Sequence, residues 1–387
     1  MGENDSAGTG PAPAGTGDDH FLNRSLDRQT LLKSGAAGML ALGGLATAGS
    51  AAADVLTLTA RSGEKWSIGM SNAYIGNDWR KQMAEAASRA ADEMKKKGFL
   101  ADYTAVHGTD NAVDKQISVV NDMILKQMDG ILLLASSGTQ VNGVIDRATK
   151  SGVKVVTFDA YATSRKSWNI GFNFGEWGRT NALFMEKLLG GPGKAQGNIL
   201  IVRLSLGAVA GRLIYNEYKK MLKRNPGLKL VGEVEGSATR SVTQKAVSQI
   251  LPNLPKIDGV LGAGGNDSYG IVEGFRAAGI KDKDIPPIAT GADGDFIQFV
   301  AKQYAARRYQ HQGLNAQPEI GAWAVYFITK LLNNGWSKPT DYYAPSVPTT
   351  SRNAASYAKV KGQRIPVQTF SYAQVPAVFQ KTAKLPG

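Results

Sequence analysis

The feature that most constrains the fold is a regular alternation of short apolar runs with longer segments of helical periodicity. Such runs indicate buried strands, and their alternation with helices indicates a parallel sheet covered on both faces. Several runs are followed by polar residues. Asp159 directly follows run 153–158 and Asp293 directly follows run 288–292, while Asn266 comes shortly after run 259–263. Asn77 and then Trp79 come after run 66–71. Because ligands bind outside the carboxyl ends of the strands in open α/β sheets, these residues predict one shared site for a small, uncharged, hydroxyl-rich molecule.

The helical signal is clearest in residues 78–97, where apolar residues recur at helical spacing and lysines precede Gly98. The other predicted helices are 112–127, 140–151, 176–189, 212–224, 241–251, 268–278 and 318–334. The other predicted strands are 101–106, 130–135, 198–204, 228–233 and 309–314, with one more near 367–370. The same strand–helix pattern therefore occurs in two successive halves of the chain.

This pattern predicts an α/β protein with two doubly wound parallel-sheet lobes joined by a hinge of several chain crossings. The first lobe is predicted to comprise residues 64–172 and 316–340, because the apolar helix that Pro318 opens needs burial. Residues 173–315 form the predicted second lobe, and 341–387 form a tail that can return to it.

The hinge is predicted where the chain leaves one half for the other. Crossings are expected near residues 171–174 and 314–317, with a further crossing in the tail. Crossings of this kind allow two lobes to close over a ligand.

Composition excludes several kinds of site. The chain has no cysteine, so it has no disulfide, no thiol nucleophile, no thiolate metal site and no lipidated cysteine anchor. The histidines, His20, His107 and His311, do not stand at metal-ligand spacing. The glycine-rich segments 190–194 and 262–267 lack the spacing of phosphate and dinucleotide fingerprints. We therefore expect no metal and no cofactor.

The net charge of +13 raises the possibility of nucleic-acid binding. The cations are dispersed, mixed with acids and gathered only in short clusters near helix ends, where they complement the helix dipole. None of these clusters is interleaved with aromatic residues as a base-stacking surface requires. The charge therefore indicates a solvated basic surface, and no nucleic-acid partner is expected.

The N-terminal segment has the three-part layout of an export signal. Residues 1–20 are too polar to fold, a basic segment follows, and an apolar Gly/Ala stretch ends in small residues that predict cleavage near Ala53. The basic segment is similar to a twin-arginine export signal but has Gln29 after Arg28. The whole leader, 1–53, therefore predicts a periplasmic product.

Short segments at these strand ends carry a resemblance to a known family. The segments are Ser71-Asn72-Ala73-Tyr74-Ile75-Gly76-Asn77-Asp78-Trp79-Arg80, Phe158-Asp159, Gly211-Arg212, Gly265-Asn266-Asp267, Gly291-Ala292-Asp293-Gly294 and Asn315-Ala316-Gln317-Pro318-Glu319-Ile320-Gly321. In this order and at these distances they resemble the type I periplasmic binding proteins, in particular the ribose/galactose-like sugar-binding group of ABC importers. The resemblance covers residues 64–340 and implies a non-catalytic protein that closes two lobes over its ligand.

The resemblance also implies the ligand-binding residues. It places Asp159, Arg212, Asn266, Asp293 and Asn315 on sugar hydroxyls, and Ser71, Asn77 and Trp79 along the lip of the first lobe. Structural alternatives remain open for most of them: Asp159, Asp293, Asn77 and Asn266 can cap helices or turns, Trp79 can belong to the core, and Asn315 can serve the hinge. Arg212 is different, because a cation at a helix start opposes the dipole and therefore favours a functional role.

Two departures from the family pattern concern aromatic residues. The family often has paired aromatics after the first strand, whereas here the segment Gly76-Asn77-Asp78-Trp79 leaves one, and no aromatic residue occurs in 238–240, where one is expected opposite it. The departures indicate a ligand that is smaller, more polar or held differently from ribose.

These observations predict a monomeric periplasmic protein that delivers a small sugar or polyol to an ABC permease in the inner membrane. One alternative is a secreted α/β carbohydrate-active enzyme with Asp159 and Asp293 as paired carboxylates. Another is a ligand-binding input to a chemoreceptor or sensor. A sugar-responsive repressor is disfavoured by the leader and by the lack of a helix-turn-helix segment.

Overall fold

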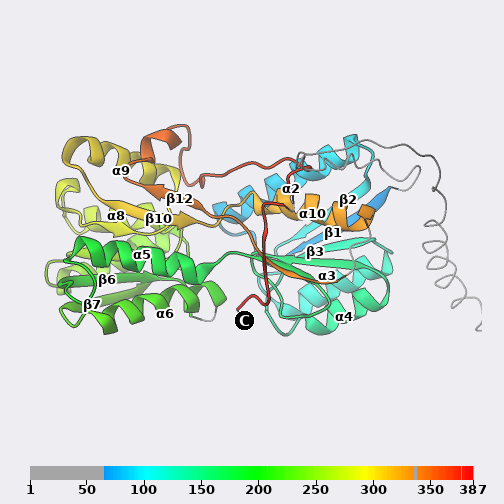
Figure 1. The fold of residues 1–387 in the computed structure, drawn as a ribbon, viewed down its shortest axis with the longest axis horizontal. Coiled ribbons are helices and arrows are strands. Elements are labelled where there is room, and N and C mark those ends of the chain that lie inside the picture. The colour runs from blue at the N-terminus through cyan, green and yellow to red at the C-terminus, as the bar shows by residue number, and fades with distance from the viewer. Residues whose placement is uncertain (1–64, 207, 335–337, 376, 387) are drawn as a thin grey trace, which may run out of the picture. The chain divides into compact units, whose positions relative to one another are not determined.

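The computed structural model describes residues 65–206, 208–334, 338–375 and 377–386. The predicted export leader, 1–53, lies outside these residues. Within them the strands form two mostly parallel sheets, with the orders β13-β11-β5-β4-β3-β1-β2 and β12-β10-β9-β8-β6-β7. Figure 1 shows helices on both faces of each sheet, so the predicted fold class of two α/β lobes is confirmed.

The first lobe is built around the seven-stranded sheet. Helices α2 (Asp78–Lys96) and α10 (Ile320–Asn334) cover one face, and α3 (Val113–Leu125) and α4 (Asn142–Lys150) cover the other (Figure 1). All neighbours pair in parallel except β11 and β13. The strands are β1 (Trp66–Asn72), β2 (Leu100–His107), β3 (Gly130–Leu134), β4 (Lys154–Phe158), β5 (Trp168–Gly171), β11 (Asp341–Tyr343) and β13 (Gln380–Thr382).

The second lobe is built around the six-stranded sheet, in which only β12 runs antiparallel to its neighbour. One face carries α5 (Phe174–Leu188) and α6 (Val209–Arg224), and the other carries α7 (Arg240–Ile250), α8 (Ser268–Ala277) and α9 (Gly294–Arg307). The strands are β6 (Gly197–Arg203), β7 (Leu228–Glu235), β8 (Gly259–Gly262), β9 (Ile288–Ala289), β10 (His311–Asn315) and β12 (Val347–Thr350), and the 3₁₀ turns are η1 (Leu251–Asn253), η2 (Asp282–Asp284) and η3 (Ala354–Tyr357).

Several elements differ from the sequence-based expectation. Strand β5 and helix α9 were not predicted, and the strand expected near residues 367–370 is wrong. In that segment Val367 is exposed and the amide of Gln368 binds the side chain of Gln317 instead of a neighbouring strand. The tail contributes β12 to the second sheet and β11 and β13 to the first.

Within the described ranges the chain passes between the two sheets four times. The passages lie between β5 and α5, between β10 and α10, between β11 and β12, and between β12 and β13. Aromatic rings line the first passage, where Phe172 meets Phe174 edge-on and Phe174 stacks on Trp177. The hinge therefore has one more crossing than the sequence predicted.

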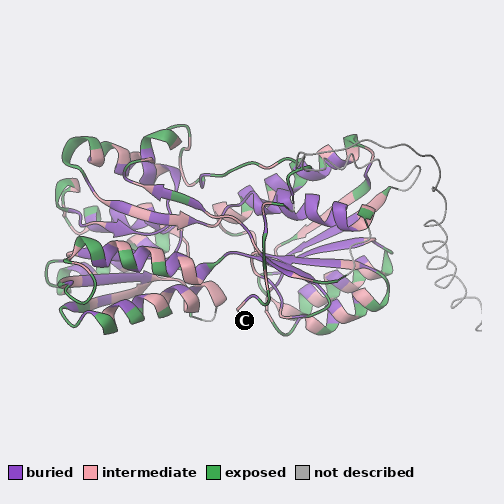
Figure 2. Cartoon of the chain, in the orientation of Figure 1, coloured by how far each residue is buried: buried purple, intermediate pink, exposed green. Residues whose placement is uncertain are grey.

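Helix α10 belongs to the first lobe although it follows the second in the chain. It is mostly apolar and is buried from Ile320 to Leu331, as Figure 2 shows along its length. One side packs on α2 and another on β3 and β4, while Phe370 and Phe379 of the tail lie against Trp323. Its approach to α2 requires Gly321, because a Cβ there would lie 2.2 Å from the carbonyl oxygen of Met83.

We predict that Gly321→Ala lowers the free energy of unfolding by about 3 kcal/mol, because the new methyl group forces α10 and α2 apart. The measurement is urea unfolding of both proteins. Gly143→Ala is the matched control, since a Cβ on this helical glycine meets only the flexible end of Arg147, at 3.9 Å. Equal stability of the two variants would contradict the close-packing argument.

Candidate functional site

Asp159 and Arg80 form a partly buried ion pair in the first lobe. Asp159 directly follows β4, and Arg80 lies in the first turn of α2. Arg80 Nη2 lies 3.3 Å from Asp159 Oδ2, and the two side chains are only 17% and 15% exposed. The other terminal nitrogen, Arg80 Nη1, is buried without a hydrogen-bond partner among the described residues. Because buried donors are nearly always paired, this nitrogen points to a ligand or water that completes the site.

The backbone and charge state of Asp159 are both unusual. Its φ of 57° lies in the left-handed region, which non-glycine residues adopt mainly where the surroundings hold them. Burial raises the pKa of the carboxyl group, and the Arg80 guanidinium and the Ala160 amide oppose this increase. The strand end thus presents a carboxylate that is poorly hydrated and held in one orientation.

Arg80 was not among the predicted site residues, although a signal for it was present. A cation in the first turn of a helix opposes the helix dipole, which is the argument that singled out Arg212. In the structure this unfavourable position brings Arg80 to Asp159.

The other predicted residues of the first lobe are placed differently. Trp79 packs partly against the core, its indole nitrogen donates to the carbonyl oxygen of Ala316 at 2.8 Å, and Arg80 lies over its ring. Asn77 caps α2 by accepting from the Arg80 amide at 2.9 Å. Ser71 is completely buried and accepts from Gln116 at 3.2 Å. The Trp79 ring lies against the Arg80 guanidinium, and a ligand contact for all three residues stays a prediction.

Asp293 in the second lobe is fully buried, and its two carboxylate oxygens are placed differently. Its Oδ1 accepts from the Phe296 amide at 2.9 Å and so caps α9. Its Oδ2 is buried without a hydrogen-bond partner among the described residues. Burial raises the pKa of this carboxyl group well above its usual value, opposed by the Phe296 amide and by Arg240. The capping alternative and a ligand contact are thus compatible, since each uses a different oxygen.

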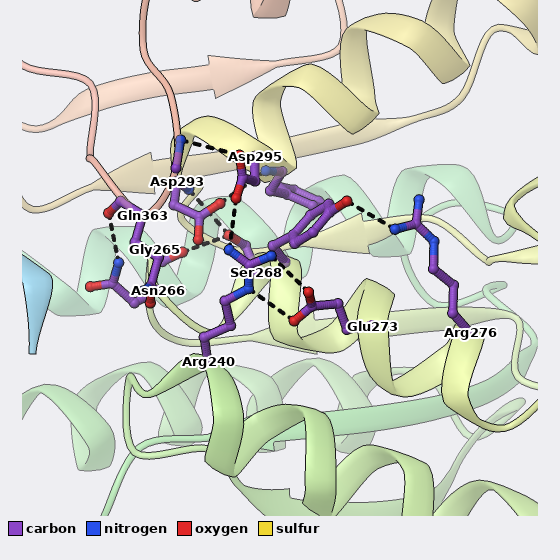
Figure 3. A network of polar contacts seen from close by, with 12 residues as sticks. Arg240, Gly265, Asn266, Ser268, Glu273, Arg276, Asp293, Asp295 and Gln363 are labelled. Carbon is purple, nitrogen blue, oxygen red and sulfur yellow. Dashed lines mark hydrogen bonds and ion pairs between the residues drawn. The ribbon is translucent and has the colours of Figure 1, made fainter.

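Asn266 lies close to Asp293 in a network of polar contacts (Figure 3). The Asp293 amide donates to Ser268 Oγ at 3.1 Å, and Ser268 Oγ donates to the Gly265 carbonyl at 2.5 Å. The side-chain amide of Asn266 donates to the carbonyl oxygen of Gln363 in the tail at 2.9 Å. The structure thus brings Asn266 and Asp293 together, and it gives the Asn266 amide a partner within the chain.

Asn315, the last residue of β10, has its hydrogen bonds inside the hinge. Its Oδ1 accepts from the Ala292 amide at 2.7 Å, and its Nδ2 lies 3.4 Å from the Val347 carbonyl and from Thr349 Oγ1. These bonds join the end of β10 to β12 and to the loop before Asp293. The geometry favours the hinge alternative for this residue.

Arg212, near the start of α6, donates to the carbonyl oxygen of Leu206 at 3.4 Å. Its guanidinium is also one of the charges that act on the hydroxyl of Tyr161, two positions after Asp159. Burial raises the pKa of the Tyr161 hydroxyl, neighbouring acidic groups add to this, and the Arg212 guanidinium opposes it. A contact between Arg212 and a ligand stays a prediction.

Sequence reasoning also missed two buried polar groups near these strand ends. One is the hydroxyl of Ser136, which follows β3, and the other is the indole nitrogen of Trp177, in the first turn of α5. Both are buried without a hydrogen-bond partner among the described residues. Ser136 obeys the same rule as Asp159, a polar residue just after an apolar strand. Nothing in the sequence distinguishes Trp177 from a core residue.

Neither a metal-binding cluster nor a membrane-spanning helix is found in the described part of the chain. Its histidine and acidic side chains do not gather in groups of three or more that could hold a metal ion. Across the same ranges, no helix has the length and apolar character needed to cross a membrane.

We predict that Arg80 and Asp159 are energetically coupled by about 1–3 kcal/mol in a double-mutant cycle of Arg80→Gln and Asp159→Asn, measured by urea unfolding. The reason is that each single change leaves the other group poorly hydrated and unpaired. The exposed pair Glu176 and Arg179 is the control, and Glu176→Gln with Arg179→Gln should give no measurable coupling. Similar coupling in the two pairs would mean that burial does not strengthen the Arg80–Asp159 pair.

Comparisons with known proteins agree with this architecture. A solved ABC transporter solute-binding protein from Thermobispora bispora is 25% identical, with a TM-score of 0.69 over 80% of this chain and 92% of that one. A solute-binding protein from Actinobacillus succinogenes with bound D-allose is 18% identical, with a TM-score of 0.64 over 76% of this chain and 100% of that one. One from Bacillus halodurans with bound myo-inositol is 18% identical, with a TM-score of 0.61 over 76% and 98%.

A search of curated proteins finds no match to the sequence. The family model described as "Periplasmic binding protein domain" matches residues 68–335, which is more than half of the 387-residue chain. The chain therefore belongs to the periplasmic binding protein domain family.

Proposed function

We propose that this protein is the solute-binding component of an ABC importer and that it captures a small, neutral sugar or polyol. The ligand lies between the Arg80–Asp159 pair of the first lobe and Asp293 of the second, with Arg212 at the same edge. The site is completed or supported by five further residues, Asn266, Asn315 and the lip residues Ser71, Asn77 and Trp79. The closed complex is then delivered to a permease.

The proposal rests on two of the buried groups that lack a hydrogen-bond partner among the described residues, a donor at Arg80 Nη1 and an acceptor at Asp293 Oδ2. Leaving such groups unpaired costs about 1–3 kcal/mol each, and more where they are charged. A hydroxyl group both accepts and donates, so a polyhydroxylated ligand satisfies both. A charged ligand is less suitable, because it would be repelled by either the arginine or the carboxylates.

The similar structures support the same class of ligand. Besides the proteins with bound D-allose and myo-inositol, a solute-binding protein from Burkholderia graminis in complex with D-arabinose has a TM-score of 0.62 at 23% identity. Members of the periplasmic binding protein family are not enzymes, so the alternative of a carbohydrate-active enzyme is set aside.

Titration calorimetry with a panel of pentoses, hexoses and polyols tests the proposal. We expect at least one member to bind with a dissociation constant in the micromolar range, which corresponds to about 8 kcal/mol. Asp293→Asn should weaken that ligand about tenfold or more through loss of a charge-assisted hydrogen bond, because asparagine still caps α9. Asp159→Asn should have an effect of similar size.

Asp146→Asn is the matched control, because this half-exposed carboxylate on α4 forms an ion pair with Lys166 and is not one of the proposed ligand residues. It should leave the affinity unchanged. If no sugar or polyol of the panel binds better than millimolar, the proposed ligand class is wrong.

We also propose that residues 1–53 are an export leader that places the mature protein outside the inner membrane, through a route similar to twin-arginine export. The family to which the chain belongs suggests an extracytoplasmic location. Amino-terminal sequencing of the exported protein should begin at Asp54. Recovery of the uncleaved chain from the cytoplasm alone would contradict this.

A further inference from the structure

The tail segment 361–368 is bound to the second lobe at the edge where the proposed ligand residues lie. The Gly294 amide donates to the Arg364 carbonyl, and the Asp295 amide donates to the Gly362 carbonyl. The Gly362 amide in turn donates to Asp295 Oδ1 at 3.1 Å. The contact is close, because a Cβ on Gly294 would lie 2.7 Å from the backbone of Lys361.

Charged side chains hold this anchor in place, as Figure 3 shows. Arg240 Nη1 lies 2.7 Å from Asp295 Oδ2, and the same guanidinium pairs with Glu273. Its other face lies over the ring of Tyr269, at 4.4 Å from the centroid. Asp295 is thereby fixed to α7 and α8 as well as to the tail.

The same segment is bound to the first lobe through Gln82 of α2, which is 7% exposed. Gln82 Oε1 accepts from the Ile365 amide at 3.1 Å, and Gln82 Nε2 donates to the Gln363 carbonyl at 3.4 Å. That carbonyl also accepts from Asn266 of the second lobe. A single tail carbonyl is therefore shared by side chains of both lobes.

Adjacent residues of the segment are bonded to different lobes, so no flexible stretch of chain separates the two attachments. Arg364 is bonded to Gly294 of the second lobe, and the next residue, Ile365, is bonded to Gln82 of the first. Consecutive Cα atoms are about 3.8 Å apart, so they cannot stretch. Any motion that separates the start of α2 from the start of α9 must therefore break the bonds on one side.

We propose that residues 361–368 form an internal clasp across the ligand edge and that Gln82 is the positioning residue that couples separation of the lobes to release of the tail. The clasp holds the two lobes near their present separation before any ligand arrives. It also engages one of the two N–H donors of the Asn266 side-chain amide, through the Gln363 carbonyl.

Distance measurements between the lobes of the ligand-free protein test the clasp directly. The chain has no cysteine, so spin labels on Lys150→Cys in α4 and Lys245→Cys in α7 report only the chosen exposed sites. Double electron–electron resonance should give one narrow distance distribution for the labelled parent. Gln82→Met, which keeps the shape and removes both bonds, should broaden the distribution and move it to longer distances.

Asp295→Ala is the second variant, because it loosens the clasp from the opposite lobe and should shift the distribution in the same direction. Gln298→Met is the matched control. Gln298 also donates to tail carbonyls, those of Ala358 and Val360, but it binds the tail within the second lobe only. It should leave the distribution unchanged.

Hydrogen exchange gives a quantitative reading of the same coupling. Loss of the two Gln82 hydrogen bonds should speed exchange of the Asp295 amide, in the other lobe, by about thirtyfold, since each neutral bond contributes about 1 kcal/mol. Distributions that superimpose for the parent, Gln82→Met and Asp295→Ala, or unchanged exchange at Asp295, would overturn the clasp. Neither readout requires a ligand, so this outcome is independent of whether a sugar binds.

Discussion

The interleaving of the two sheets is the constraint on which the rest of the structure depends. Neither lobe is made from one continuous stretch, because α10 and β11 return to the first sheet after β10 has completed most of the second. Gln317 shows how tightly the passages are joined. It is fully buried in the second passage, donates to the Pro345 carbonyl of the third, and accepts from the Gln368 amide of the fourth. Strand ends from both lobes are consequently held near one edge, and the site follows from that arrangement.

The chemistry of the site follows from the poor hydration of its carboxylates. Asp159 and Asp293 both have raised pKa values, with burial as the main cause. A buried carboxylate with few partners is unfavourable, and Arg80 compensates for only part of this at Asp159. Hydroxyl donors stabilise the charged form without bringing a charge of their own. This is a physical reason for a neutral, polyhydroxylated ligand at these strand ends.

Much of the fold could be predicted from the sequence, because the strands and helices of both lobes have strong apolar periodicity and clear ends. The unpredicted elements lack those signals. Strand β5 is short, and α9 is buried on several sides, so its apolar residues do not form one stripe. The tail strands span only three or four residues each and are stabilised by partners distant in the chain. A pattern within the segment itself could not reveal them.

Predictions for the site were limited in another way. The rule that polar residues follow strands selected Asp159 and Asp293 but could not tell which of their oxygen atoms lack a partner. It also could not show that the side chain of Asn315 is hydrogen-bonded within the chain. Ser71 and Asn77 are satisfied by Gln116 and by the start of α2, which only three-dimensional geometry reveals.

The tail illustrates why its role could not be predicted from composition alone. A segment without apolar periodicity cannot bury enough surface to order itself. Residues 361–368 are ordered instead by hydrogen bonds that come from α2, from the start of α9 and from Asn266. Because those partners belong to different lobes, the order of the tail and the separation of the lobes cannot vary independently. A segment that resembles a linker in sequence is thus hydrogen-bonded to both lobes beside the proposed ligand site.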